Sequence, residues 1–199
     1  MPERPLSDRE WEGAWAPYDD ATYRAALLFI QPDDVVLDIG AGDLRFARRA
    51  AQRARQVIAI EQRLDLLTSP YPPNLLALCG DARRTPFPRG ITVGVLLMRH
   101  CQHFAMYARK LRAVGCRRLV TNARWGMDVE AVALAPQPPF DSAATGWYAC
   151  LCGAVGFKPN VPEQLDDAAL NTVAQVESCP ACAEADDRGR ITYVSSFVI

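Results

Sequence analysis

The sequence predicts an α/β fold in which a doubly wound, mostly parallel sheet carries helices on both faces. Apolar runs with the length of strands recur between residues 35 and 122. Segments with apolar residues at helical spacing separate several of these runs. Glycines or acidic residues follow the runs at their carboxyl ends. Because strands that alternate with helices form parallel sheets, we expect ligands to bind outside the carboxyl ends of the strands.

The expected elements can be placed in order along the chain. A helix is expected over residues 19–30, because acids that can cap it precede apolar residues at helical spacing and Pro32 follows. Strands are expected at residues 35–39, 56–61, 75–79, 91–98 and 118–122, and a last one at 191–199. Further helices are expected after Gly42, over residues 104–114 and, from helical spacing, over residues 127–135.

Length and charge narrow the class of protein. The chain has 199 residues, half of them apolar, which suffices for one core and a small appended element. Its 22 basic and 23 acidic residues leave no global basic excess of the kind that many nucleic-acid binders have. No run approaches the ~18 apolar residues of a membrane helix, and the N-terminus has no signal-sequence pattern. We therefore expect a cytoplasmic protein without a membrane partner.

An apolar run that ends in Asp-x-Gly-x-Gly is the most informative motif. Its residues are Asp38, Gly40 and Gly42, at the end of the first expected strand. Glycine lets the backbone approach a ligand, and a following helix presents free N–H groups at its start. A dinucleotide-binding fingerprint would need a further glycine at the position of Arg45. The acid before the first glycine instead favours a cationic cofactor that carries an amino acid.

This motif and three later ones resemble the class I S-adenosylmethionine-dependent methyltransferases. The second expected strand ends in Glu61, the third is followed by Gly-Asp-Ala at residues 80–82, and residues 86–88 are Pro-Phe-Pro. The fourth leads to Arg-His-Cys-Gln-His at residues 99–103. One position departs from the family pattern Asp-x-Gly-x-Gly-x-Gly, because its third glycine is Leu44. A side chain is therefore expected where the family's cofactor approaches the backbone closely.

The resemblance implies a Rossmann-like sheet of the seven-stranded type, the cofactor S-adenosylmethionine and a methyl-transfer activity. In the family, the acid after the second strand accepts hydrogen bonds from both ribose hydroxyls, and Glu61 matches that position. Asp81 is placed to contact the adenine amino group, and Ala82 to lie beside the ring. The residues expected to bind the cofactor are Asp38, Gly40, Ala41, Gly42, Glu61, Gln62, Asp81, Ala82 and Arg99.

The segment after the fourth expected strand contains the only two histidines of the chain, His100 and His103. This segment should border the methyl acceptor. A histidine there can take the proton of an oxygen or nitrogen nucleophile, so both are candidate catalytic residues. The alternative is that they are hydrogen-bonded supports at a strand end. We expect a small-molecule acceptor, with RNA or a protein as the next alternatives.

Aromatic residues precede the first expected helix. Trp11, Trp15 and Tyr18 lie in a short polar segment. They could fold over a cofactor as a lid, or pin the terminus to the core. We favour the second interpretation, because aromatic side chains commonly anchor chain termini.

Four cysteines in the C-terminal third have the spacing of a metal site. Cys150 and Cys152 form one pair, and Cys179 and Cys182 form the other after residues 153–178. Four thiolates repel one another unless a dication neutralises them, and zinc is the usual ion for such a set. The pairs resemble the knuckles of a zinc ribbon, which predicts a structural zinc ion bound by all four. Disulfide pairing or a redox Cys-x-x-Cys is the alternative, although a reducing cytosol disfavours disulfides.

These observations divide the chain into four expected segments. They are an N-terminal segment and helix at residues 1–34, a cofactor-binding core at 35–135, a zinc-ribbon-like insertion at 136–185 and a final strand of the core sheet at 186–199. The predicted function is S-adenosylmethionine-dependent methyl transfer. The alternative is an inactive relative that uses the fold and the zinc ribbon to bind RNA or protein. Leu44 favours this alternative, and the intact acids of the motifs oppose it.

Overall fold

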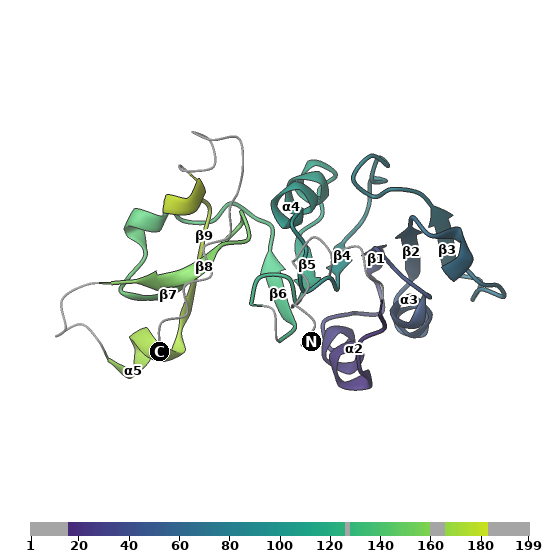
Figure 1. Ribbon diagram of the computed structural model, residues 1–199, viewed down its shortest axis with the longest axis horizontal. Helices are drawn as coiled ribbons and strands as arrows, with labels where there is room; N and C mark the ends of the chain where they lie inside the picture. The colour runs from purple at the N-terminus through teal and green to yellow at the C-terminus, as the bar shows by residue number, and fades with distance from the viewer. Residues whose placement is uncertain (1–15, 126–127, 160–165, 183–199) are drawn as a thin grey trace, which may run out of the picture. The chain divides into compact units, whose positions relative to one another are not determined.

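The computed structural model describes residues 16–125, 128–159 and 166–182. The chain falls into two compact units, divided between Ala135 and Pro136. Figure 1 labels the helices and strands of both units. The first unit contains the Asp-x-Gly-x-Gly motif and the second contains the four paired cysteines.

A six-stranded sheet forms the centre of the first unit. Its strands are β1 (Val35–Ile39), β2 (Gln56–Glu61), β3 (Leu75–Cys79), β4 (Val93–Leu96), β5 (Arg118–Thr121) and β6 (Glu130–Ala133). Their order across the sheet is β3-β2-β1-β4-β5-β6. All neighbours are parallel except β5 and β6, which are antiparallel. The strand order reverses between β1 and β4, and such a switch point is where doubly wound sheets bind ligands.

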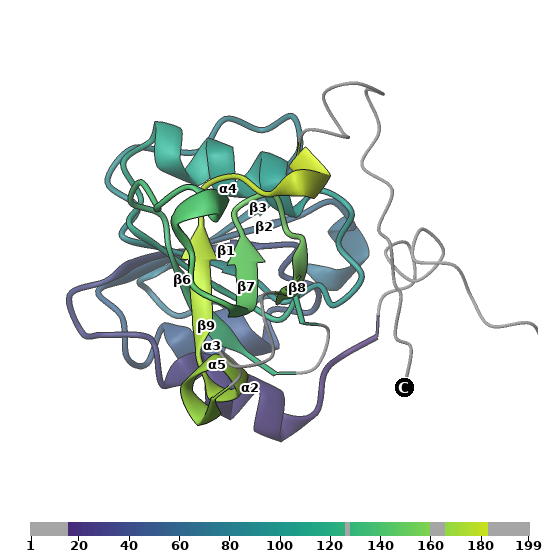
Figure 2. The same cartoon turned by 90° about the vertical axis from the view of Figure 1, so that its left-hand side faces the viewer.

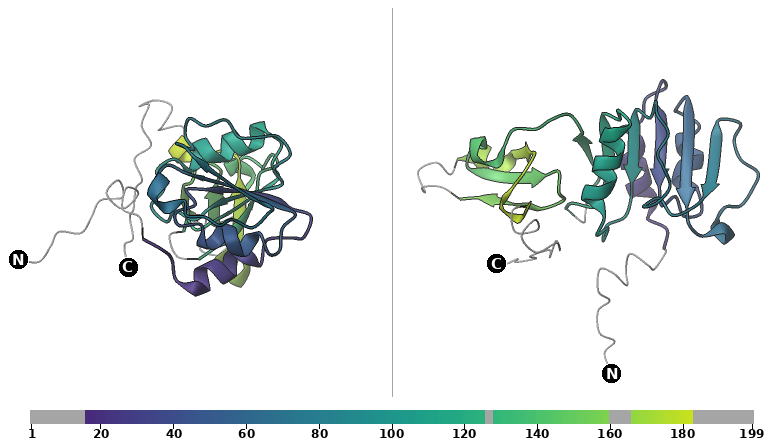
Figure 3. Two further views of the ribbon diagram at one scale, coloured as in Figure 1. Left: turned by 90° about the vertical axis from the view of Figure 1, so that its right-hand side faces the viewer. Right: turned by 90° about the horizontal axis from the view of Figure 1, so that it is seen from above.

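Helices cover both faces of this sheet. Figure 1 shows α2 (Asp20–Leu27) and α3 (Arg45–Ala50) on one face and α4 (Phe104–Ala113) on the other. The right-hand view of Figure 3 shows the strands lying side by side. A short 3₁₀ turn, η1 (Leu64–Leu66), follows β2. None of the helices in the described ranges is long and apolar enough to cross a membrane.

The ends of α2 and the packing of α4 follow from particular residues. The Asp19 carboxylate caps α2 by accepting a hydrogen bond from the Thr22 backbone N–H at 2.7 Å, as the sequence predicts. On the opposite face, Leu111 of α4 lies directly over Gly94 of β4. A Cβ on Gly94 would lie 2.4 Å from the Leu111 Cδ1 atom. The missing side chain therefore lets α4 pack close to the sheet.

The strands of the first unit are enclosed by a continuous apolar core. All five residues of β1 are buried, and Val36, Leu37 and Ile39 have no exposed surface. Strands that are apolar along their whole length are typical of parallel sheets covered on both faces. The expected strands at residues 35–39 and 56–61 agree with β1 and β2 in both bounds.

One predicted element is wrong. The spacing of residues 127–135 predicts a helix, but residues 130–133 form β6, which pairs with β5 so that Val132 lies opposite Leu119. Burial alternates along β6, with Val132 buried and its neighbours Ala131 and Ala133 exposed. Pairing with the open edge of β5 therefore outweighs the helix preference of alanine and glutamate. The last strand expected at residues 191–199 lies outside the described residues.

The second unit contains a three-stranded sheet of β7 (Gly146–Cys150), β8 (Val155–Lys158) and β9 (Val173–Val176), which Figure 2 shows. β7 lies in the middle, antiparallel to β8 and parallel to β9. A 3₁₀ turn, η2 (Phe140–Ser142), precedes β7, and the short helix α5 (Asp167–Asn171) precedes β9. The buried cluster of this unit comprises only Cys150, Val176 and Cys179 among the described residues. Partly buried hydrophobic residues, among them Phe140 and Tyr148, pack against this cluster.

Candidate active site and cysteine cluster

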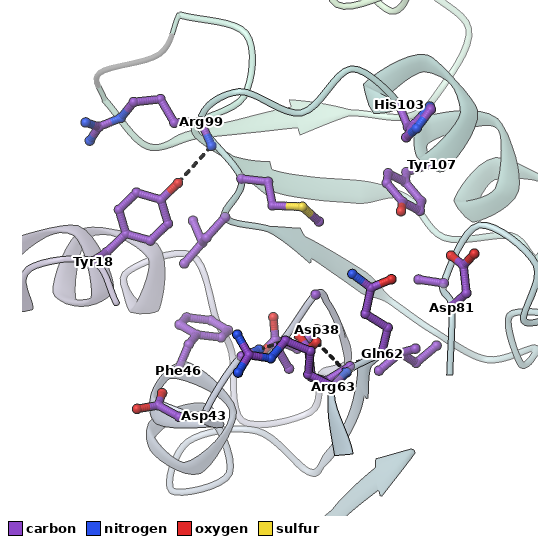
Figure 4. Close-up of a pocket in the computed structure, with 18 of the residues that line it drawn as sticks. Tyr18, Asp38, Asp43, Phe46, Gln62, Arg63, Asp81, Arg99, His103 and Tyr107 are labelled. Atoms are coloured by element: carbon purple, nitrogen blue, oxygen red, sulfur yellow. Dashed lines mark hydrogen bonds between the residues drawn. The ribbon is translucent and has the colours of Figure 1, made fainter. Parts of the chain in front are cut away.

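A cavity of about 850 Å³ lies at the carboxyl ends of β1 to β4, where the strand order reverses. Its size falls within the range of small-molecule sites. Figure 4 shows side chains from several elements around it. Every residue expected to bind the cofactor and both histidines line it, namely Asp38, Gly40, Ala41, Gly42, Glu61, Gln62, Asp81, Ala82, Arg99, His100 and His103. The structure therefore brings all of these residues into one cavity.

The turn between β1 and α3 uses glycine at positions of positive φ. Gly40 has a φ of +70°, and a Cβ there would lie 2.7 Å from the Met98 Cε atom. Gly42 also has a positive φ, of 54°. The Gly40 backbone N–H donates to the Ile60 carbonyl at 2.9 Å, which ties the turn to the end of β2. Bare backbone therefore faces the cavity, as the motif predicts.

Glu61 is buried at the end of β2 and is held by two backbone hydrogen bonds. Its Oε2 accepts from the Gly42 N–H at 2.9 Å, and its Oε1 accepts from the Arg63 N–H at 2.9 Å. An ionised carboxylate oxygen offers about two acceptor positions. Each oxygen therefore keeps one position for a ligand, and the carboxylate is oriented by the backbone in advance.

Asp38 is a buried acid at the end of β1 with an unsatisfied oxygen. Its side chain is 3% exposed, and its Oδ2 has no hydrogen-bond partner among the described residues. Burial raises the pKa of Asp38 to about 7, and the nearby charge of Glu61 adds to the effect. A buried carboxylate without a partner is costly. A cationic hydrogen-bond donor in the cavity would relieve this cost.

Asp81 differs from these two acids because it is partnered and more open to solvent. Its Oδ1 accepts from the Arg83 backbone N–H and from the Arg83 Nε, both at 2.9 Å. The hydrogen bond from the Arg83 side chain lowers the pKa of Asp81. Lys110 of α4 holds the following loop, with its Nζ donating to the Thr85 carbonyl at 2.8 Å. A side chain of α4 thus holds the loop that carries Ala82.

Leu44 occupies the position of the third motif glycine. Its φ is 66°, in the left-handed region that glycine adopts without cost, so the backbone keeps the conformation of the motif. Its side chain has no exposed surface and packs in the main core cluster. It is not among the residues that line the cavity. The side chain expected at this position therefore turns into the core and not into the cavity.

Tyr18 connects the segment before α2 to the end of β4. Its hydroxyl accepts a hydrogen bond from the Arg99 backbone N–H at 2.8 Å, a contact drawn in Figure 4. Its ring lies beneath the Arg99 guanidinium, 5.5 Å from ring centre to guanidinium carbon. Tyr18 therefore anchors this segment and also lines the cavity. Trp11 and Trp15, which the lid and anchor interpretations also include, lie outside the described residues.

The two histidines lie on the segment between β4 and α4. His103 is the N-cap residue of α4, directly before Phe104, and its backbone N–H donates to the Cys101 Sγ at 3.4 Å. Figure 4 shows its ring beside that of Tyr107. His100 also lines the cavity. Both histidines are therefore open to the cavity, and an acceptor bound in the cavity could contact an imidazole.

Sequence reasoning missed several lining residues, including Phe46, Met98 and Tyr107. Tyr107 had a usable signal, since it follows His103 by four residues in an expected helix and so shares its face. Met98 had a weaker one, because it directly precedes the segment at residues 99–103. Phe46 had none, because an apolar residue early in a helix is most often part of the core.

The four paired cysteines of the second unit converge. All four Sγ atoms lie within 4.8 Å of one another. The Sγ distances are 3.6 Å for Cys150 to Cys182, 3.7 Å for Cys152 to Cys179 and 3.9 Å for Cys179 to Cys182. None of the four is in a disulfide. A four-cysteine cluster therefore exists where the spacing predicts one.

Crowding perturbs the thiols of this cluster. Its side-chain hydrogen bonds with Cys150 first, and with Cys179 next, raise the pKa of Cys152. Side-chain hydrogen bonds with Cys150 and Cys152 lower the pKa of Cys179. A dication could replace the thiol protons, because the thiolate is the metal-binding form of cysteine.

Comparisons with known proteins give structural neighbours only. No protein-family model matches the sequence, and no curated protein matches it. A dimethyladenosine transferase from Plasmodium falciparum is 20% identical with a TM-score of 0.44, over 52% of this chain and 41% of that one. The 23S rRNA methyltransferase ErmE is 23% identical with a TM-score of 0.43, over 54% of this chain and 47% of that one.

A third similar structure is described as a putative S-adenosylmethionine-dependent methyltransferase from Listeria monocytogenes. It is 19% identical with a TM-score of 0.42, over 52% of this chain and 55% of that one. The matched part thus spans less than two thirds of each of these three structures.

Proposed function

We propose that this chain is an S-adenosylmethionine-dependent methyltransferase that acts on a small molecule. One observation carries the proposal: Asp38, Glu61 and Asp81, at or after the ends of three adjacent parallel strands, all line one cavity. The unsatisfied Asp38 oxygen supports it, because a cofactor with a cationic amino group would supply the missing donor. The core position of Leu44 removes the feature that favoured an inactive binding module.

The residues present fit this cofactor. Glu61 keeps one acceptor position on each oxygen for the two ribose hydroxyls. Asp38 would attract the cationic amino acid end, and Gly40 and Gly42 would let that end approach the backbone. Asp81 and the fixed loop at Ala82 would hold the adenine. These assignments agree with the roles that the family resemblance implies.

The chemistry of the reaction places modest demands on the chain. S-Adenosylmethionine supplies a methyl group that is already activated by the positive sulfur. The chain's part is to hold the acceptor in line, exclude water and remove the proton of the acceptor heteroatom. We assign that proton to the imidazole of His100 or His103, since both line the cavity. The new bond forms from the heteroatom to the methyl carbon as the carbon–sulfur bond breaks.

We propose in addition that the four cysteines bind one structural zinc ion. Tetrahedral zinc with bonds of about 2.3 Å places its sulfurs about 3.8 Å apart. The three Sγ distances of 3.6, 3.7 and 3.9 Å are close to this value. Four protein ligands leave no open position, so the role is structural and not catalytic. Cysteines that bind metal persist in reducing compartments, which supports a cytoplasmic location.

A labelling experiment tests the proposed activity. The full chain is incubated with S-adenosylmethionine labelled in the methyl group and with a cell extract that is then separated into small molecules, RNA and protein. We expect label in the small-molecule fraction and none with Asp38→Ala. Label in RNA or protein would keep the activity but overturn the small-molecule acceptor. No label in any fraction, from protein that binds the cofactor, would contradict methyl transfer.

A further inference from the structure

The charged residues that line the cavity divide into two sides. Figure 4 shows Asp38, Asp43 and Arg63 along one side and Arg99 and His103 along the other. The first side belongs to β1, β2, β3 and the turns that follow them. The second belongs to the segment between β4 and α4.

The first side is acidic, and its cations are paired. Four carboxylates line the cavity there, those of Asp38, Asp43, Glu61 and Asp81. Arg63 pairs with Asp65 at 2.7 Å, and Arg83 pairs with Asp81 at 2.9 Å. This side suits a ligand with positive charge, as the proposed cofactor has.

The second side has no acid. From β4 onward, the lining residues are Leu97, Met98, Arg99, His100, Gln102, His103 and Tyr107. Asp19, which interacts electrostatically with Arg99, does not line the cavity and uses its carboxylate to cap α2. One arginine and two histidines thus line this part of the cavity without a lining carboxylate.

Arg99 carries the charge of the second side and is incompletely satisfied. Its Nε is buried and has no hydrogen-bond partner within the described part of the chain, and no ion pair to it is found there. The Tyr18 ring contacts one face of the guanidinium but cannot accept at Nε in its plane. A guanidinium matches the two oxygens of a carboxylate or phosphate.

We propose that the methyl acceptor is a small molecule with an anionic oxygen group, a carboxylate or a phosphate, bound at Arg99 on the second side of the cavity. This inference rests on the proposed function. The cavity of about 850 Å³ lies toward the upper end of the range of small-molecule sites, which leaves room for an acceptor beside a cofactor. The sequence predicts that Arg99 binds the cofactor; in this proposal Arg99 instead determines which acceptor binds.

Titration calorimetry with simple probes tests the proposal. The full chain is first saturated with S-adenosylhomocysteine, and then benzoate, phenyl phosphate and benzamide are titrated in turn. We expect at least one of the two acids to bind about tenfold or more tightly than the neutral amide. Tighter binding of benzoate would indicate a carboxylate site, and tighter binding of phenyl phosphate would indicate a phosphate site.

Two variants connect this preference to Arg99. Arg99→Gln should weaken the preferred acid about tenfold or more while the affinity for S-adenosylhomocysteine stays unchanged. The matched control is Arg89→Gln, because Arg89 is exposed and does not line the cavity. It should change neither affinity.

Several results would overturn the proposal. One is equal affinity for the amide and the acids. Another is no binding of either acid at about 20 mM, a concentration above the weak fragment dissociation constants of about 1–10 mM. The third is binding of the acid that is unchanged in Arg99→Gln. Displacement of the acid by a short single-stranded RNA would point to a macromolecular acceptor instead. Failure of S-adenosylhomocysteine itself to bind would contradict the proposed function, and the first titration alone reveals it.

Discussion

The cavity of the first unit and the cysteine cluster of the second are built in opposite ways. The cavity residues stand on strands enclosed by a large apolar core, and backbone hydrogen bonds orient Glu61 before a ligand arrives. The cysteine cluster is itself part of the core of its unit, where Cys150 and Cys179 pack with Val176.

The two units should therefore differ in whether folding precedes ligand binding or depends on it. The first unit can form its site from apolar packing alone and then bind a ligand. In the second unit, the buried cluster among the described residues is small, and small units of this kind depend on a metal or another crosslink. Binding should therefore add modest stability to the first unit and most of the stability of the second.

The largest expected effect is the loss of the metal. Purified protein should contain about one zinc ion per chain. Cys179→Ser should release it and unfold the second unit, since structural zinc contributes on the order of 10 kcal/mol to such folds. Elemental analysis and the near-ultraviolet circular dichroism of Trp147 and Tyr148 would measure the two changes.

A cysteine outside the cluster provides the control for the loss of zinc. Cys79→Ser removes an exposed cysteine of the first unit and should leave the zinc content unchanged. S-Adenosylhomocysteine should still bind to Cys179→Ser, because the cavity belongs to the first unit. Metal-free protein with a well-folded second unit would overturn the zinc assignment.

The next effect concerns Leu44 in the core of the first unit. Leu44→Ala should cost about 2–5 kcal/mol of unfolding free energy, because it leaves a cavity. Leu44→Gly should be more stable than Leu44→Ala by about 1 kcal/mol, since glycine relieves the left-handed backbone. Urea unfolding measures both. If Leu44→Ala were as stable as the natural protein, the side chain would not lie in the core.

A smaller effect is expected from the charge of Glu61. Glu61→Gln should weaken S-adenosylmethionine binding by about 10- to 100-fold, because a charged acceptor for two hydroxyls becomes neutral. Calorimetric titration measures the loss, and the melting temperature checks the fold. Asp65→Asn is the matched control, since Asp65 is exposed and forms an ion pair with Arg63. Unchanged affinity of Glu61→Gln would remove this residue from the site.

The smallest effect is a dependence of binding on pH. Burial raises the pKa of Asp38 to about 7, so in the free protein this carboxyl is mostly protonated at pH 6. A cationic ligand favours the ionised form, and binding below pH 7 must first release the proton. The affinity for S-adenosylmethionine should therefore rise about fivefold from pH 6 to pH 7. Calorimetry of Asp38→Asn should show no such rise, and a persistent rise would assign it to another group.

The fold of the first unit was largely predictable from the sequence. The one wrong prediction among its described residues, a helix in place of β6, has a physical reason. The strands β1 and β2 stand out because their apolar runs are continuous and end in an acid or a glycine turn. β6 was missed because four residues rich in alanine and glutamate carry a helix signal that strand pairing overrides. The alternation of Val132 and Leu134 with exposed residues was the available clue.

The site was predictable as a set of residues but not as a set of contacts. Sequence spacing placed Asp38, Glu61 and Asp81 at one edge of the sheet. It could not show that Leu44 turns into the core, because the sequence does not specify the direction of a side chain in a left-handed turn. Nor could it show that Arg99 lies opposite the acids, because that depends on how β4 and α4 pack.

Calorimetric titration of the full chain with S-adenosylmethionine, and then with S-adenosylhomocysteine, tests whether the cavity binds the cofactor. Both should bind to the natural protein with micromolar dissociation constants, about −8 kcal/mol. Glu61→Gln, folded to the same melting temperature, should bind both more weakly. Absence of binding to either ligand at millimolar concentration would contradict the assignment of the cavity.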